Sequence, residues 1–189
     1  MKKFELTAES KINIFGKKLF RIKALISFGS VKEGETGGWV EKEENLNQSG
    51  NAWVSGNAEV YGNARVSGNA RVYGDARVYG DARVYGDAWV YGDARVYGNA
   101  RVYGDAWVYG NARVSGDADY TTIHGFGTQF RTTTFFKCKD KQVKVSCGCF
   151  FGTIPEFREQ VKNTREGKIA EEYLMIADLM EKHFAKEAK

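Results

Sequence analysis

A six-residue repeat dominates the middle of this chain and restricts its fold more than any other feature. From Gly50 the sequence reads GNAWVS GNAEVY GNARVS GNARVY GDARVY GDARVY GDAWVY GDARVY GNARVY GDAWVY GNARVS, and a weaker twelfth unit, GDADYT, follows. Ala and Val stand two residues apart in each unit, so in an extended segment both side chains point to one side. Each unit therefore predicts a strand of about four residues with one small apolar face.

The Gly-Asn or Gly-Asp pair between units predicts a sharp corner. Glycine adopts positive φ without penalty, and Asn and Asp tolerate it better than other residues do. A helix is disfavoured, because a glycine in each unit would cost about 1 kcal/mol relative to Ala. Antiparallel hairpins remain an alternative, but the identical corners and inward pairs favour a coil that advances in one direction and stacks its Ala and Val side chains.

The fixed spacing of a small and an aliphatic inward residue resembles that of the hexapeptide-repeat proteins, which form left-handed parallel β-helices. In that family three hexads complete one triangular turn, so the resemblance implies about four turns for the twelve units. Residues 27–56, which include SVKEGETGGWV, are more narrowly similar to the YdcK-like transferase group and to related bacterial and phage repeat proteins. Together the two resemblances cover residues 20–118 and leave function open, because such helices carry many roles.

The expected fold is mainly β: a left-handed parallel β-helix with an N-terminal β cap and a small C-terminal α+β domain. The expected regions are residues 1–49 for the cap and an irregular first turn, 50–121 for the repeats, and 122–189 for a β-hairpin plus two helices. A cap is expected because the exposed end of a β-helix is an open template for edge pairing. Within it we expect extended segments at residues 11–15 and 18–25, and Val31, Val40 and Leu46 in the first turn.

Local patterns also predict elements in the C-terminal region. Residues 131–138 and 142–147 predict a hairpin. Thr153, with Glu156 three residues later, predicts the start of a helix. Apolar residues at helical spacing predict a second helix over residues 168–186.

If eighteen residues complete a turn, outward residues fall on three faces, with rungs about 4.8 Å apart. The first face carries two columns: Trp53, Arg71, Trp89 and Trp107, and beside them Ser55, Tyr73, Tyr91 and Tyr109. The second carries Glu59, Arg77, Arg95 and Arg113, and beside them Tyr61, Tyr79, Tyr97 and Ser115. The third carries Arg65, Arg83, Arg101 and Asp119, and beside them Ser67, Tyr85, Tyr103 and Thr121.

The first face predicts a subunit boundary. Stacked tryptophans beside tyrosines would leave an apolar patch of the kind that marks an interface. We therefore expect a homo-oligomer, which the family resemblance implies to be a trimer. The expected interface residues are Trp53, Trp89, Trp107, Tyr73, Tyr91 and Tyr109.

The two Arg and Tyr faces admit two physical interpretations, and a third is that they are only a by-product of repeat duplication. Neighbouring guanidinium groups at rung spacing repel by roughly 3 kcal/mol at an effective dielectric near 20. In the first interpretation corner aspartates such as Asp81 and Asp87 offset this repulsion, and the arginines only cover the sheet. In the second, planar cations beside aromatic rings bind a nucleotide or another flat anion. The candidate binding residues are Arg65, Arg77, Arg83, Arg95, Arg101, Arg113, Tyr79, Tyr85, Tyr97 and Tyr103.

The distribution of charge argues against a nucleic-acid partner. Residues 50–118 contain seven basic and seven acidic side chains, and the formal net charge of +4 comes equally from the two flanks. Nucleic-acid binding usually leaves a one-signed footprint instead. The acidic and polar start argues against a signal peptide, and no stretch of about 18 consecutive apolar residues occurs. We therefore expect a cytoplasmic protein without a membrane partner.

Catalytic and metal-binding patterns are sparse. His124 is the one candidate general base, by analogy with hexapeptide acyltransferases, but no partner carboxylate is assignable to it. His183 is expected on a helix. Cys138, Cys147 and Cys149 are expected to be reduced thiols, because their spacing is poor for zinc. No P-loop, Rossmann or nucleophile-elbow pattern occurs, GFG at 125–127 is too short to count, and we expect neither a cofactor nor a metal.

These observations favour a noncatalytic oligomeric scaffold that presents a regular Arg, Tyr and Trp surface to a partner or a small anionic ligand. The phage resemblance makes sequestration of a host nucleotide signal one form of this hypothesis. The alternative is a hexapeptide-type acyltransferase or related group transferase, which rests on the scaffold analogy and His124 alone.

Overall fold

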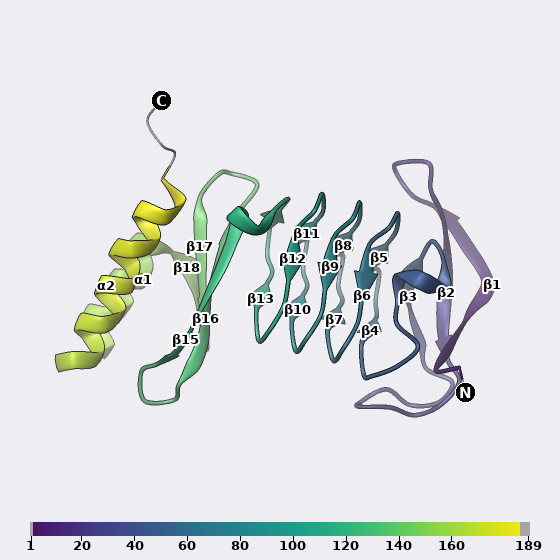
Figure 1. Cartoon of the computed structure of the whole chain (residues 1–189), viewed down its shortest axis with the longest axis horizontal. Coiled ribbons are helices and arrows are strands. Elements are labelled where there is room, and N and C mark those ends of the chain that lie inside the picture. The colour runs from purple at the N-terminus through teal and green to yellow at the C-terminus, as the bar shows by residue number, and fades with distance from the viewer. Residues whose placement is uncertain (1, 186–189) are drawn as a thin grey trace. The chain divides into compact units, whose positions relative to one another are not determined.

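The computed structural model of the chain describes residues 2–185 and contains two compact units (Figure 1). One unit ends at Asp117 and the other begins at Ala118. The first contains the repeats and the strands that precede them, and the second contains the remaining strands and both helices. Neither helix in the described residues has the length and apolar character that crossing a bilayer requires.

The repeats form a parallel β-solenoid of two-residue strands. Each of the first eight strands pairs in parallel with the strand eighteen residues further along, as Arg83 pairs with Arg101. The strands are β4 (Trp53–Val54), β5 (Glu59–Val60), β6 (Arg65–Val66), β7 (Arg71–Val72), β8 (Arg77–Val78), β9 (Arg83–Val84), β10 (Trp89–Val90), β11 (Arg95–Val96), β12 (Arg101–Val102), β13 (Trp107–Val108) and β14 (Arg113–Val114). The parallel stacking and the roughly four turns are confirmed. The left-handed sense stays a prediction. The strands are shorter than expected, because the corner occupies the rest of each hexad.

Ala and Val fill the interior of the solenoid, as the repeat predicts. The Ala and Val of every hexad from Ala52 to Val114 are 0% exposed. Backbone hydrogen bonds join successive turns, and Arg83 N–H donates to the Ala100 carbonyl at 2.9 Å. Gly86 shows why the corners need glycine: its φ is +71°, and a β-carbon there would lie 2.9 Å from the Gly104 nitrogen one turn on. A side chain at this corner would strain both the backbone and the stacking.

The corner Asn and Asp side chains form ladders of their own. Asn63 donates to Asp81 at 3.0 Å, and Asn69 donates to Asp87 at 2.9 Å, each across one turn. Within the described residues no corner Asp forms an ion pair with a repeat Arg. Any offset of the arginine charge by these carboxylates therefore acts over a longer distance than direct pairing.

An antiparallel three-stranded sheet precedes the solenoid. Its strands are β1 (Phe4–Ile12), β2 (Lys18–Ala24) and β3 (Thr36–Val40), and β3 pairs in parallel with β5. The extended segment expected at residues 18–25 is confirmed. The one expected at 11–15 is wrong, because the strand starts earlier and the chain then turns. In that turn Gly16, with φ +75°, donates its N–H to the Asn13 carbonyl at 3.0 Å.

An irregular first turn connects this sheet to the repeats. Val40 and Leu46 pair in parallel with the valines twenty residues further along, so both extend the inner columns as expected. A short 3-10 helix, η1 (Glu43–Asn45), lies between them. Val31 departs from the expectation: it is buried, but it forms an antiparallel bridge with Phe28, because the loop after β2 folds back on itself.

The second unit is a four-stranded antiparallel sheet with two helices. In sheet order its strands are β15 (Tyr120–Phe126), β16 (Arg131–Lys137), β17 (Val143–Cys147) and β18 (Phe150–Thr153), and the helices are α1 (Ile154–Thr164) and α2 (Gly167–Phe184). The hairpin of β16 and β17 is the expected one, whereas β15 and β18 are additional strands. Asp119, expected on the third solenoid face, lies instead in a 3-10 turn, η2 (Asp117–Asp119).

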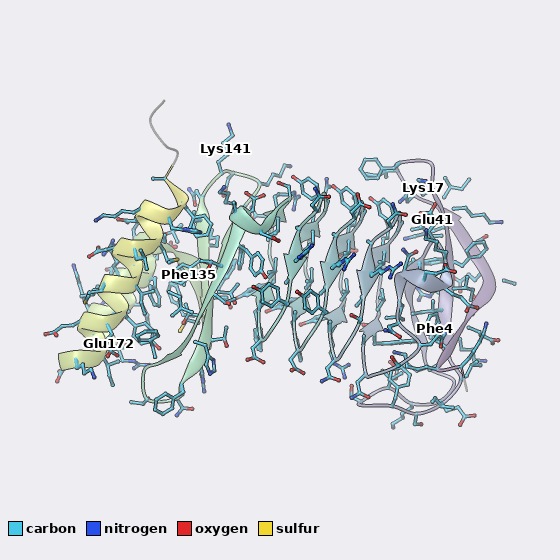
Figure 2. All side chains as sticks on the ribbon, in the orientation of Figure 1. Phe4, Lys17, Glu41, Phe135, Lys141 and Glu172 are labelled. Carbon is cyan, nitrogen blue, oxygen red and sulfur yellow. The ribbon has the colours of Figure 1, made fainter. Side chains whose placement is uncertain are left out.

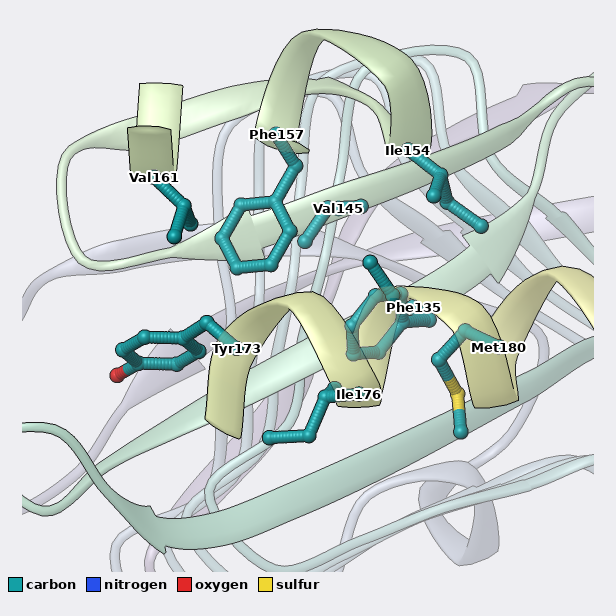
Figure 3. Packing of buried hydrophobic residues seen from close by; sticks show 9 residues of the cluster. Phe135, Val145, Ile154, Phe157, Val161, Tyr173, Ile176 and Met180 are labelled. Carbon is teal, nitrogen blue, oxygen red and sulfur yellow. The ribbon is translucent and has the colours of Figure 1, made fainter. Parts of the chain in front are cut away.

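Helix α1 begins as the sequence predicts. Thr153 N–H donates to the Glu156 carboxylate at 2.6 Å, and Glu156 N–H donates to the Thr153 hydroxyl at 3.4 Å, which completes a capping box. The expected end of the second helix, residue 186, lies outside the described residues. Both helices pack on the sheet through an apolar cluster that includes Phe135 and Phe157 (Figure 3).

Candidate ligand-binding faces of the solenoid

The strand registers confirm the first column of outward residues on each expected face, except that Asp119 lies outside the third. The tryptophan face carries Trp53, Arg71, Trp89 and Trp107 on β4, β7, β10 and β13. The capped arginine face carries Glu59, Arg77, Arg95 and Arg113 on β5, β8, β11 and β14. The open arginine face carries Arg65, Arg83 and Arg101 on β6, β9 and β12. Figure 2 shows the outward side chains as rows along the turns.

Trp53 does not belong to the exposed part of the tryptophan face. Its side chain is 2% exposed, and the rings of Phe4 and Phe28 lie edge-on to it, with centroids 6.4 and 5.5 Å away. The N-terminal strand and the loop after β2 thus occupy the place where Trp53 was expected to meet another subunit. This corrects the expectation: Trp53 is a core residue of its own chain.

The rest of the tryptophan face is an accessible aromatic stack. The Trp89 and Trp107 rings stack with centroids 5.4 Å apart, and Trp107 is 39% exposed. Beside them Tyr73, Tyr91 and Tyr109 stack at 4.8 and 4.6 Å. Burial, and then the neighbouring phenols of Tyr109 and Tyr73, raise the pKa of Tyr91 well above its usual value. The Tyr91 side chain is therefore neutral at physiological pH.

The capped arginine face is largely satisfied by its own chain. Glu59 is 6% exposed and pairs with Lys11 of β1 at 2.8 Å and with Arg77 at 3.4 Å. At the other end, Arg113 donates to the Ala112 carbonyl at 2.7 Å. These contacts leave little of this row for an external ligand.

Burial also distinguishes the capped arginine face. Burial, and then the charge of Arg95, lower the pKa of Arg113. The tyrosines of this face form one stacked column, Tyr61, Tyr79 and Tyr97, with centroids 5.1 and 5.2 Å apart. Phe15 covers the first two rings at 6.2 and 6.0 Å. The N-terminal hairpin therefore shields one end of this face.

The open arginine face, in contrast, presents its guanidinium groups to solvent. Arg65, Arg83 and Arg101 are all exposed. Across the part of the chain that the structure describes, none of the three forms an ion pair. Because like charges one turn apart repel, an anion placed along this row would lower the repulsion.

A groove of about 630 Å³ runs along the open arginine face. It is lined by Glu43, Glu44, Leu46, Asn47, Gln48, Arg65, Val66, Ser67, Arg83, Tyr85 and Arg101. Both oxygens of Glu43 accept from the Lys2 ammonium, at 2.7 and 3.0 Å. With Glu43 neutralised in this way, three arginines face the single remaining carboxylate of Glu44, and the groove has a net positive charge.

The Tyr85 ring forms a flat aromatic wall of this groove, next to the short side chain of Ser67. Tyr85 stacks on Tyr103 with ring centroids 5.3 Å apart and planes 13° apart. On the other side of Tyr85 the column continues with Ser67, whose side chain is too short to cover a ring. One face of the Tyr85 ring therefore lines the groove beside the arginine row and offers a surface for stacking a planar group.

The histidines lie outside these faces. His124 is exposed in β15, with Nδ1 3.0 Å from the Thr132 hydroxyl, and no carboxylate pairs with it in the described residues. His183 is exposed on α2. Within residues 2–185 the three cysteines form no disulfide, and no group of three His, Cys, Asp or Glu side chains is placed to hold a metal ion.

The fold and these faces define a β-solenoid repeat protein. More particularly, the repeats match the family model of the YdcK beta solenoid repeat, over residues 58–74, 64–77, 76–92, 94–110 and 106–118. No curated protein matches the chain. The matched segments all lie within the solenoid, so this likeness concerns the repeats and not the preceding sheet or the second unit.

Proposed function

We propose that this protein is a noncatalytic binding scaffold that holds a nucleotide-like anion in the groove of the open arginine face. One observation carries the proposal: Arg65, Arg83 and Arg101 are exposed without ion pairs in the described residues, in a groove that the Tyr85 ring also lines. Sequestration of a host nucleotide signal, an idea that the resemblance to phage repeat proteins suggests, is one biological form of this proposed function.

The arginine row suits a chain of phosphates. Guanidinium groups bind phosphate oxygens through two parallel hydrogen bonds. Successive arginines of the row stand one rung apart, about 4.8 Å. A ligand with several phosphates can therefore contact neighbouring arginines at once, and its charge offsets their mutual repulsion.

The space beside Ser67 suits a base. A planar ring placed there would continue the stack of Tyr85 and Tyr103. Stacking of a base on an aromatic side chain contributes about 1–3 kcal/mol and depends little on which base it is. The groove volume of about 630 Å³ falls within the range of small-molecule sites.

We also propose that the chain self-associates through the tryptophan face. It consists of the stacked Trp89 and Trp107, of which Trp107 is 39% exposed, and of the partly buried tyrosine column beside them. A trimer is the order that the hexapeptide-repeat resemblance implies. The open arginine face is a separate face of each turn, so self-association through the indoles is compatible with ligand binding.

A test of the base contact uses the two halves of a nucleotide. Calorimetric titrations with ATP, adenosine and inorganic triphosphate compare the complete probe with its parts, and we expect ATP to bind most tightly. Ser67→Tyr fills the space beside Tyr85 and should weaken ATP binding about tenfold or more while sparing triphosphate. Ser55→Tyr makes the same change on the tryptophan face and should leave ATP binding unaltered.

A second pair of variants tests the phosphate contact. Arg83→Gln should weaken ATP and triphosphate by about tenfold or more, because a charge-assisted hydrogen bond is lost. Arg95→Gln removes the same charge from the capped arginine face and should have little effect. Equal losses in the two variants would show that the overall charge of the solenoid, and not the groove, attracts the anion.

A further inference from the structure

The second unit contains a pocket that the proposed function does not use. Its volume is about 400 Å³, within the range of small-molecule sites. The buried side chains of Phe157 and Val161 line it together with Tyr173, and the exposed Arg131 and Arg165 complete the lining at the surface. Figure 3 shows Phe157, Val161 and Tyr173 at the same end of the apolar cluster.

The two arginines of this pocket are not neutralised. Arg158, on the same helix as much of the lining, pairs with two carboxylates. Arg131 and Arg165 form no ion pair with any described residue, and the oxygens they contact are neutral: the Gln129 side chain at 3.2 Å and the Thr164 carbonyl at 2.9 Å. No Asp or Glu is among the described residues that line the pocket.

Two glycines with left-handed backbone make room for the polar groups. Gly148 has φ +60°, and a β-carbon there would lie 2.6 Å from Arg131 Nη1. Gly127 has φ +72°, and a β-carbon there would lie 2.5 Å from the Tyr173 hydroxyl. The short GFG and CGC segments of the sequence thus position an arginine and a tyrosine of the pocket.

Tyr173 places a neutral hydroxyl group in the pocket. Its hydroxyl donates to the Phe126 carbonyl at 3.2 Å. Burial, and then the neighbouring Cys147, raise the pKa of Tyr173 to about 12, while the positive charges of Arg165 and Arg131 act in the opposite direction. Both guanidinium groups line the same pocket as this phenol. The phenol is neutral at physiological pH, so the lining carries a net positive charge.

From this geometry we propose that the second unit binds a small organic carboxylate. Arg131 and Arg165 hold the carboxylate, because guanidinium groups match its two oxygens. The apolar body of the ligand packs beside Phe150 and Phe151, which line the pocket and keep accessible surface that a ligand can remove from water, above the buried Phe157 and Val161. A bare inorganic anion would satisfy the arginines alone, so an anion with an apolar body is the better fit.

Calorimetry of the full chain with 3-phenylpropionate tests this site. The matched neutral ligand is 3-phenylpropanamide, and inorganic phosphate is the anion without an apolar body. We expect saturable binding of 3-phenylpropionate, and binding at least about tenfold weaker for the amide and for phosphate. The amide shows how much binding comes from apolar contact without the charge. Phosphate shows how much comes from charge without an apolar body.

Variants locate the binding. Arg131→Gln and Arg165→Gln should each weaken 3-phenylpropionate about tenfold. Lys162→Gln removes a charge from α1 outside the pocket lining and should have no effect. Arg83→Gln, in the solenoid groove, should also have no effect, so failure of this proposal is distinguishable from failure of the nucleotide proposal.

Three results would overturn the site. These are equal binding of the amide and the acid, unchanged affinity in both arginine variants, and no saturable binding of either 3-phenylpropionate or hexanoate up to about 10 mM. Thermal unfolding of each variant provides the control for folding, and a midpoint like that of the wild type attributes a lost affinity to the pocket.

Discussion

The backbone of Gly37 lies against the indole of Trp53, so closely that a β-carbon at residue 37 would lie 2.6 Å from Trp53 Cζ2. The same β-carbon would lie 2.5 Å from Ile22 Cγ1. With Trp53 already 2% exposed, neither neighbour has free space into which to move. Glycine at this position therefore allows the N-terminal strands to close over the first turn, and the GGWV segment has a structural role.

Gly37→Ala should destabilise the first unit by about 1–3 kcal/mol, the usual cost of overpacking a close-packed site. Gly116→Ala is the matched control, because a β-carbon there meets nothing within 4 Å and the residue has no left-handed φ. Urea unfolding followed by tryptophan fluorescence measures both. Equal stability of the two variants would mean that the contact at residue 37 relaxes without cost.

Val84→Asp tests the interior of the solenoid. Val84 is 0% exposed in the column of inward valines, so the substitution buries an unpaired carboxylate and should cost several kcal/mol. Arg83→Asp places the same side chain one residue away on the exposed surface and should cost far less. A loss below about 0.5 kcal/mol for Val84→Asp, typical of a surface change, would contradict the assignment of this column to the core.

The faces of the solenoid were predictable because the hexads have no insertions, so their spacing alone places every outward residue in its column. The difference between the two arginine faces was not predictable in this way. Arg77 and Arg83 occupy identical GDARVY units, yet one is paired with Glu59 and the other is exposed. Arg77 is held by Glu59, which also pairs with Lys11 of β1, whereas β6, β9 and β12 form a sheet that contains no strand from the N-terminal region. One signal in the sequence marks it, because Glu59 is the one acid in its column.

The second unit was less predictable, for a related reason. Its hairpin and its helix start depend on local signals, such as the Thr153 capping box, and both are confirmed. Strands β15 and β18 depend on pairing with the hairpin instead. Strand β15 contains the segment TTIHGF, which is largely polar, and β18 is only the four residues FFGT. Neither segment indicates by itself that it pairs with the hairpin. The pocket of Arg131 and Arg165 was missed with them, because these residues are brought together only by the finished sheet and helices.

The raised pKa of Tyr91 predicts a loss of stability at high pH. Its folded-state pKa lies above the value of about 10 for an unfolded tyrosine, so its contribution to the free energy of unfolding is complete below pH 10 and falls as the pH rises further. The fall is at most about 1.4 kcal/mol per pH unit for one phenol. Tyr91→Phe should therefore lose less stability than the wild type between about pH 10 and 12. Denaturant midpoints across this range measure the difference, and parallel curves would count against the assignment.

His124→Ala distinguishes the scaffold from the transferase. His124 contacts Thr132 at 3.0 Å and no carboxylate in the described residues, so it lacks the partner that would make it an effective general base. We expect the variant to bind ATP as the wild type does and neither protein to consume acetyl-CoA. If the wild type consumed acetyl-CoA and the variant did not, the transferase hypothesis would be favoured over the scaffold.

Replacing Trp89 and Trp107 with Arg tests self-association through the tryptophan face. Burying the exposed part of Trp107, roughly 100 Å², contributes about 2–3 kcal/mol per subunit before the costs of association. The double variant extends the row that Arg71 begins, and the open arginine face already contains three stacked arginines, so the fold of each chain should survive. We expect the sedimentation mass to shift toward the monomer. Tyr85→Arg with Tyr103→Arg adds the same charge to a different face and should leave the mass unaltered. An unchanged mass in the tryptophan variant would leave this face for a partner other than a second copy of the chain.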